Sequence, residues 1–343
     1  MAILGGDIMR EPIAKVNLMR YGWAGILDWH RAGYTGKGIK ICVIDADTNT
    51  RLVRYPERVT NLAQSGNLKD WTKDYGFHGL ATIDIIQQIL PDANIVFASW
   101  VYPLNHIVEW CIGHNVDIIT ASLSYSHNTL SRDISEKAVE AGIKMVSSAG
   151  NDGAVPVNLK GYPARKKSWV AVGAAVIDDF GMTPRRMSYS SIGEDLEVMG
   201  MTHLIVQMPE PFYEMVYTGT SCASPVIASM VGMIQQKEGS LSKDQFRELL
   251  MNHCVDMYDE GRDKYTGWGM LRMPALKNDR MKEIVLHVDS QEVRVDGILD
   301  SVDQPPFIVK ETGRTVVPLS FIGRMLGCHV EWDNKNRRVI IRG

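Results

Sequence analysis

The sequence predicts an α/β fold, in which a parallel sheet carries helices on both faces, followed by a small C-terminal α+β domain. Short continuous apolar runs, typical of strands buried on both faces, recur between about residues 39 and 174. Segments with a helical pattern alternate with these runs, which favours parallel strands joined by helices. The pattern changes at a polar stretch, residues 277–280, and short alternating strands follow it. We therefore expect a large first domain and a separate small module.

The elements of the large domain follow from this alternation. A helix over about residues 223–236 is apolar or small almost all round and is expected to be buried, with Pro225 in its first turn, where a missing N–H is harmless. In a parallel sheet covered by helices, active groups gather at the carboxyl ends of the strands. The expected strands are 41–44, 95–98, 116–121, 143–148 and 169–174, and the expected helices between them are 79–90, 104–114 and 131–141.

The C-terminal segment predicts a β-β-α-β-β module of about sixty residues, a size at which a small domain can have its own core. We place the boundaries at residues 1–19 for a short extension, 20–276 for the large domain and 283–343 for the module. The expected elements of the module are strands at 284–288 and 293–295, a helix at 318–326 and strands at 330–332 and 338–341.

Composition excludes several classes of protein. The chain has 343 residues, 45% of them apolar, and a formal net charge of −3 with the signs mixed, which indicates a large core and no basic nucleic-acid surface. Its five cysteines are odd in number and widely spaced, so reduced thiols are expected rather than a disulfide framework or a zinc site. No secretory signal or membrane-spanning stretch is present, so we expect a cytoplasmic protein with neither a nucleic-acid nor a membrane partner. A mature chain trimmed of its leader would look similar, although the initial Met argues against trimming.

The segment Gly219–Pro225, GTSCASP, carries the strongest chemical signal. A Gly-Thr turn delivers Ser221 to the N-terminus of a buried helix, where the helix dipole and free N–H groups favour negative charge. A serine at this place can also be a helix cap without chemistry. The seven-residue context favours a nucleophile.

This segment resembles the catalytic-serine motif of the subtilisin family, GTSxASP. Three further segments match that family in its order: Ile41–Asp45, His78-Gly79 and Ser148–Gly153. The resemblance covers about residues 20–275. It implies a subtilisin-like serine endopeptidase that acts through an acyl-enzyme, with Asp45, His78 and Ser221 as its triad and Asn151 as a donor in the oxyanion hole. Only about twenty residues precede the matched region. A short extension of this kind resembles the intracellular branch of the family.

Each of these residues can also be interpreted from its local sequence, without the family resemblance. Asp45 ends a buried strand, where a carboxylate needs a partner such as a histidine, although a turn or cap role remains open. His78 lies between a Gly-containing loop and an apolar helix, and its alternative is a structural histidine. Asn151 follows Gly150 at a strand end, where a turn residue is equally expected.

The chain departs from the family pattern near the expected cleft. Asp47 adds a second carboxylate close to Asp45, and Ser124 and Tyr125 replace two glycines, which should narrow the cleft. These changes give weight to a rival hypothesis, a non-catalytic subtilisin-like protein that binds or signals. Calcium binding is compatible with the family, but no ligands are assigned, no metal cluster is recognised and no cofactor is required. The expected substrate-binding residues are Ser122, Leu123, Ser124, Ala149 and Gly150.

Two other features carry hypotheses. The module resembles the copper amine oxidase N-terminal-like domain through residues 313–319 and 330–333. This name does not imply copper, and the module is interpreted as an interaction or spacer domain.

Cys222 adjoins the expected nucleophile. A helix N-terminus and a nearby His78 would lower its thiol pKa and make it reactive. Alternatively it points into the interior as an inert small hydrophobe.

Overall fold

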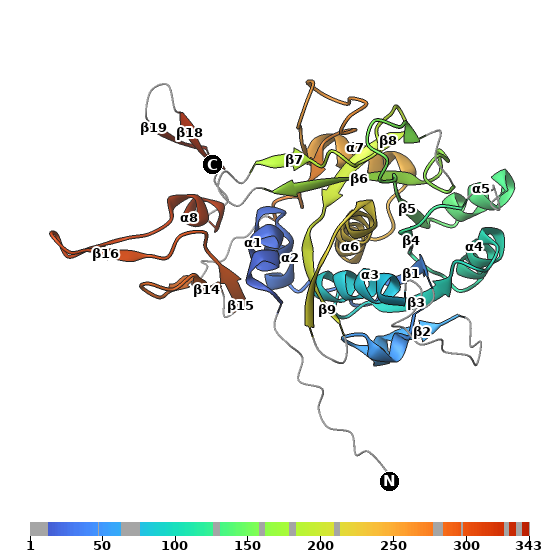
Figure 1. Cartoon of the computed structure of the whole chain (residues 1–343), viewed down its shortest axis with the longest axis horizontal. Coiled ribbons are helices and arrows are strands. Elements are labelled where there is room, and N and C mark those ends of the chain that lie inside the picture. The colour runs from blue at the N-terminus through green and yellow to red at the C-terminus, as the bar shows by residue number, and fades with distance from the viewer. Residues whose placement is uncertain are drawn as a thin grey trace, which may run out of the picture.

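A computed structural model of the chain describes residues 13–46, 48–62, 76–125, 131–157, 162–177, 183–208, 213–276, 284–295, 298–325, 329–333 and 338–342. The second carboxylate singled out in the sequence, Asp47, lies outside the described residues. A large α/β domain forms most of the molecule, and a smaller set of C-terminal strands lies beside it (Figure 1). Within the described residues, no helix combines the length and the apolar character needed to cross a membrane.

A ten-stranded sheet forms the centre of the large domain, in the order β11-β12-β8-β6-β5-β4-β1-β3-β2, with β7 paired to β6. The neighbours from β2 through to β12 pair in parallel, whereas β7 and β11 pair antiparallel. The predicted parallel sheet is therefore confirmed, with antiparallel strands added near one end. The strands are β1 (Lys40–Asp45), β2 (Val59–Asn61), β3 (Asn94–Ser99), β4 (Ile118–Ala121), β5 (Lys144–Ser148), β6 (Val170–Ile177), β7 (Pro184–Arg186), β8 (Leu196–Met201), β11 (Cys254–Val255) and β12 (Met270–Leu271).

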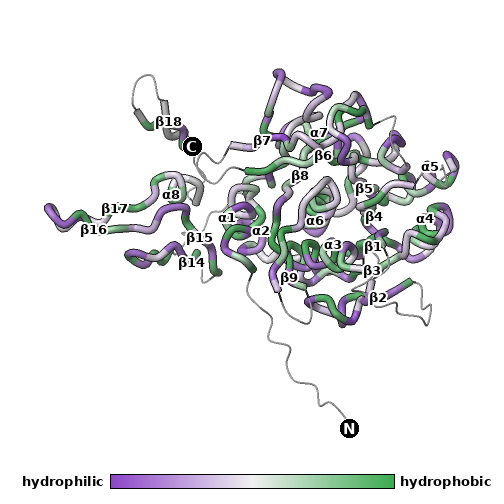
Figure 2. The backbone as a smooth tube through the Cα atoms, in the orientation of Figure 1, coloured by the Kyte–Doolittle hydropathy of each residue, from purple (hydrophilic) through white to green (hydrophobic). Residues whose placement is uncertain are grey.

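Helices cover both faces of this sheet because alternate strand residues point to opposite sides. Ile41 and Val43 of β1 join the larger apolar cluster, which contains α3 and α6, while Cys42 and Ile44 join a second cluster with α4 and α5. In Figure 2 the hydrophobic segments concentrate in the central strands and in α3 and α6. The helices are α1 (Lys15–Trp23), α2 (Ile26–Arg31), α3 (Gly76–Ile89), α4 (Leu104–Gly113), α5 (Arg132–Glu140), α6 (Thr220–Glu238) and α7 (Lys243–His253), with short 3-10 turns at Thr50–Leu52 and Pro56–Arg58.

A separate hairpin leads into α6. Its strands, β9 (Leu204–Met208) and β10 (Tyr213–Tyr217), pair antiparallel and end at Tyr217 opposite Leu204. Gly219 follows with a φ of +85°, a conformation that favours glycine, and α6 begins at the next residue. The hairpin thus fixes the position at which the chain enters α6.

The C-terminal module has five strands before its helix, where the sequence pattern predicted two. It consists of β13 (Ile284–Leu286), β14 (Glu292–Val295), β15 (Ile298–Ser301), β16 (Phe307–Val309), β17 (Arg314–Val316), α8 (Leu319–Met325), β18 (His329–Asp333) and β19 (Arg338–Arg342). Among its described residues, the buried apolar cluster of the module consists of Val293, Val295, Val302 and Phe321.

The module packs against the first helices of the large domain. Strand β15 lies on α1, and the Arg31 guanidinium at the end of α2 is paired with the Asp300 carboxylate at 2.5 Å. Both side chains are almost fully buried, at 3% and 0% exposed. Because breaking a buried pair leaves an uncompensated charge, this contact ties the module to the core of the large domain.

Candidate active site

Asp45 is the last residue of β1, at the carboxyl end of the sheet, and it is fully buried. Three donors surround its carboxylate: Oδ1 lies 2.5 Å from His78 Nδ1 and 2.7 Å from the Ala46 N–H, and Oδ2 accepts from Thr82 Oγ1 at 2.7 Å. These hydrogen bonds offset the cost of removing a charged group from water. The partner that the sequence required for Asp45 is therefore His78.

His78 lies in the first turn of α3, and Thr82 is one turn further along the same face. A Cβ on Gly79 would approach the Ala46 carbonyl oxygen to 2.8 Å, so glycine allows α3 to lie against the end of β1. Donation from Nδ1–H to Asp45 places the lone pair of the neutral imidazole on Nε2. Burial alone would lower the pKa of His78, but the charge and hydrogen bond of Asp45 outweigh it and the pKa is raised.

Ser221 is the second residue of α6 and is 9% exposed. Its Oγ donates to the Ser122 carbonyl at 2.9 Å, and Ser122 Oγ donates in return to the Ser221 carbonyl at 3.0 Å. This reciprocal pair ties the N-terminus of α6 to the residue after β4. Leu123 and Ser124 follow Ser122 directly and are partly or largely exposed.

Asn151 lies after β5, beside the N-terminus of α6. Its Oδ1 accepts from the Thr220 backbone N–H at 2.9 Å and from Thr220 Oγ1 at 3.0 Å, while the Gly150 N–H donates to Thr220 Oγ1. A Cβ on Gly219 would lie 3.1 Å from Asn151 Nδ2. With its oxygen committed to Thr220, Asn151 presents amide N–H donors next to the start of α6. Ala149 is buried, and its N–H pairs with β6.

A residue that the sequence reasoning missed, Tyr217, contacts the same histidine. Its hydroxyl lies 3.2 Å from His78 Nε2 and 2.9 Å from Thr82 Oγ1, and its ring meets the imidazole edge-on. The side chain is buried, and burial together with the Asp45 charge raises the pKa of its hydroxyl. The available signal was its place four residues before Ser221, but nothing in the sequence indicates that the ring turns toward His78.

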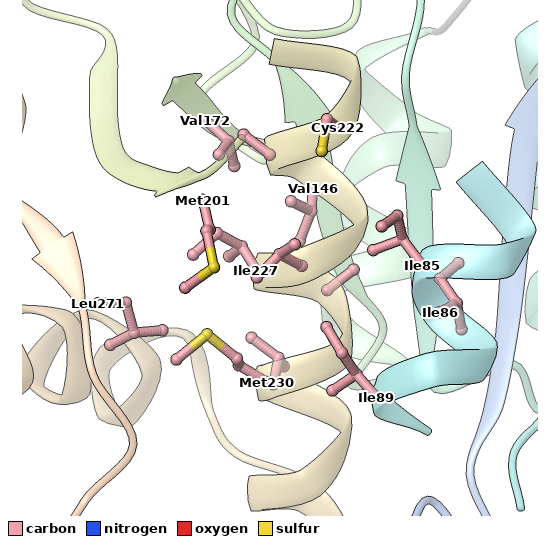
Figure 3. Packing of buried hydrophobic residues seen from close by; sticks show 14 of the residues in the cluster. Ile85, Ile86, Ile89, Val146, Val172, Met201, Cys222, Ile227, Met230 and Leu271 are labelled. Carbon is pink, nitrogen blue, oxygen red and sulfur yellow. The ribbon is translucent and has the colours of Figure 1, made fainter. Parts of the chain in front are cut away.

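Cys222 points away from this site. Its sulfur lies among hydrophobic side chains around α6, including Val146 and Val172 (Figure 3). The residue is 0% exposed, and burial raises its thiol pKa to about 12. The hypothesis of a lowered thiol pKa is therefore wrong, because desolvation of the thiolate outweighs the helix terminus.

Comparison with known proteins identifies the family. Residues 36–269 match the model of the subtilase family. The chain belongs to the subtilase family. Residues 274–341 match the model of the copper amine oxidase N-terminal domain, which confirms the resemblance of the module.

Individual relatives agree with this assignment. Subtilisin NAT of Bacillus subtilis subsp. natto is 30% identical over 274 residues, covering 72% of this chain and 67% of the relative. A subtilisin of Bacillus pumilus is 28% identical and covers 72% of this chain and 93% of the relative. Among solved structures, sphericase superposes with a TM-score of 0.58 at 21% identity, covering 70% of this chain and 93% of the other. A lanthipeptide protease superposes with a TM-score of 0.61 at 17% identity, covering 76% and 94%. This chain is thus a subtilisin-like serine-type endopeptidase.

Metal binding has no support among the described side chains. Within that part of the chain, no group of three or more His, Cys, Asp or Glu side chains is arranged to hold an ion. Calcium binding stays a prediction.

Proposed function

We propose that this subtilase cleaves peptide bonds through Asp45, His78 and Ser221. The observation that carries the proposal is the 2.5 Å hydrogen bond between Asp45 and His78 Nδ1. It fixes the tautomer in which Nε2 can accept a proton, and the buried carboxylate stabilises the imidazolium that results. A nucleophile on the first turn of a buried helix completes the arrangement.

The proposed chemistry follows from these positions. As Ser221 Oγ bonds to the substrate carbonyl carbon, its proton passes to His78 Nε2 and the carbonyl π electrons move to the oxygen. The resulting oxyanion accepts hydrogen bonds from Asn151 Nδ2 and the Ser221 N–H. Collapse of this intermediate breaks the C–N bond, and His78 gives its proton to the departing amine. Water then releases the acyl group from Ser221 by the reverse sequence.

The substrate in this proposal is a protein or peptide that binds beside Ser122–Ser124 and Ala149–Gly150. Ser124 takes the place of a family glycine and is exposed, whereas the Tyr125 side chain packs against the second apolar cluster, so the expectation that it narrows the cleft is wrong. A serine side chain at this point of the cleft favours small substrate residues. The C-terminal module is proposed to bind another protein or to act as a spacer.

Covalent labelling tests the proposal. A fluorophosphonate should react with the folded wild type on the tryptic peptide that contains Ser221, and Ser221→Ala should take no label. Ser229→Ala is the matched control, because Ser229 lies on the same helix, is fully buried and should leave labelling unchanged. Absence of label from the folded wild type would favour the rival hypothesis of a non-catalytic protein, and label on Ser221→Ala would place the reactive nucleophile at another residue.

We also propose that the enzyme acts in the cytoplasm. Four cysteines lie in the described part of the chain, and all four are free thiols there: Cys42, Cys111, Cys222 and Cys254. Reduced cysteines are typical of proteins kept in a reducing compartment. Fractionation of the source cells checks this, and recovery of the protein only from the medium would contradict it.

A further inference from the structure

The phenol of Tyr217 occupies the atom of His78 that the proposed mechanism needs. Its hydroxyl lies 3.2 Å from His78 Nε2, while the Ser221 hydroxyl donates to the Ser122 carbonyl. The proposed base, His78, and the proposed nucleophile, Ser221, are therefore each hydrogen-bonded to a residue other than one another. All four residues in these two contacts are described and are buried or half-buried.

The Tyr217 hydroxyl is the donor in its contact with His78, as the positions of the neighbouring protons indicate. A carboxylate only accepts, so Thr82 gives its single hydroxyl proton to Asp45 Oδ2. His78 gives its Nδ1 proton to Asp45, which leaves a lone pair at Nε2. Thr82 Oγ1 and this lone pair can then only accept, so the Tyr217 hydroxyl is the donor that faces both of them, Thr82 Oγ1 at 2.9 Å and His78 Nε2 at 3.2 Å. Burial raises the pKa of Tyr217 well above its ordinary value, so at neutral pH the group is a phenol with a proton to donate.

We propose that Tyr217 is a gate on the general base. In the resting enzyme its hydroxyl is hydrogen-bonded to the lone pair of His78 Nε2, and catalysis begins when substrate displaces the phenol. The inference rests on the proposed roles of His78 and Ser221. It adds that the free enzyme is held below its full reactivity by its own side chain.

The surroundings of Tyr217 indicate that the side chain moves and the backbone stays. Tyr217 is paired with Leu204 at the end of β10. Two residues on, the Gly219 N–H donates to the Tyr189 hydroxyl at 3.1 Å, and the Gly219 carbonyl accepts from Thr202 Oγ1 at 3.1 Å. With both ends held, rotation of the ring about its χ1 bond is the movement that frees Nε2.

The gate predicts a dependence on ligand size. A small alkyl fluorophosphonate makes few contacts and must wait for the phenol to leave by itself. A tetrapeptide substrate contributes binding energy that displaces the phenol. Removing the hydroxyl should therefore accelerate labelling by the small probe but change kcat for the peptide less, because saturating peptide has already displaced the phenol. A purely structural effect would change both rates alike.

Tyr217→Phe tests this, because it keeps the ring and removes only the hydroxyl. We expect the small fluorophosphonate to label Ser221 about two- to tenfold faster than in the wild type, the range that corresponds to one net hydrogen bond. The gain in kcat for a saturating tetrapeptide p-nitroanilide should be smaller. Tyr213→Phe, an exposed position on the same strand, is the control and should match the wild type.

The outcomes separate the two proposals. Equal or slower labelling of folded Tyr217→Phe overturns the gate while leaving the triad intact, and so does an equal gain in the labelling rate and in kcat for the peptide. Absence of label from both the wild type and Tyr217→Phe overturns the triad and the gate together. Thermal melting of each variant establishes that folded protein is compared.

Discussion

Asp45 and His78 are joined by a 2.5 Å hydrogen bond and supported by Thr82, whereas Ser221 donates to a backbone carbonyl and His78 Nε2 contacts a phenol. The difference reflects how each half is positioned. The first half joins the end of a central strand to the helix that Gly79 allows to lie against it. The second half depends on rotatable hydroxyls at the start of α6. In the proposed mechanism the base is thus assembled before substrate arrives, and the nucleophile must turn toward it.

The largest expected effect comes from removing the nucleophile. Ser221→Ala should lower kcat by about a million-fold, the magnitude known for subtilisin, because the neighbouring hydroxyls cannot take its place. Ser224 is one helical turn away, and its Oγ lies 3.0 Å from Thr120 Oγ1. Hydrolysis of a peptide p-nitroanilide by purified variant measures the loss. Activity within a hundredfold of the wild type would break the assignment of Ser221.

Substitution of Asp45, in the half of the site that is already assembled, should lower kcat less than substitution of Ser221. Asp45→Asn should lower kcat by about ten-thousand-fold, since an amide no longer fixes the tautomer or stabilises the imidazolium. Asp92→Asn is a surface control, in a carboxylate that is 43% exposed and pairs with Arg58, and it should change kcat little. If Asp45→Asn kept a tenth of the wild-type kcat, the Asp45–His78 bond would be structural only.

The oxyanion donor is expected to contribute less again. Asn151→Ala should lower kcat by about a hundred- to a thousandfold with little change in KM, because the donor acts on charge that forms in the transition state. Thr220→Ala removes a hydroxyl that contacts Asn151 but keeps the amide, so its loss of kcat should be smaller. Equal losses would show that the contact to Thr220 matters and the free amide does not.

The pH dependence of kcat/KM tests how strongly the Asp45 carboxylate influences the pKa of His78. Only neutral His78 can accept the serine proton, so kcat/KM should fall as the pH drops through the raised pKa of His78. The midpoint of this acid limb should lie above 6.5, the ordinary value of a histidine. In Asp45→Asn the raising influence is lost, and the midpoint should move to lower pH. An acid limb that stays in place in the variant would separate it from His78.

The sequence predicted those parts of the site that depend on local pattern. Asp45 follows a run of apolar residues, and Ser221 lies in a seven-residue segment, so both could be placed on elements without coordinates. Tyr217 could not, because its partner lies 139 positions earlier in the chain and the contact depends on how the β9–β10 hairpin packs. The extra strands of the module were missed because strands such as β16 and β17 have three residues, too few for a clear alternation.

The smallest expected effect is at Cys222, which follows Ser221 in sequence but has its side chain buried in the apolar core around α6. Iodoacetamide reacts with thiolates, and this thiol is fully buried with its pKa raised to about 12. Wild type and Cys222→Ala should therefore lose activity to the reagent at the same slow rate. Rapid inactivation confined to the wild type would mean that the first turn of α6 opens to solvent. That opening would also free Ser221 from the Ser122 carbonyl, so movement of the helix itself would control when the nucleophile turns toward the base.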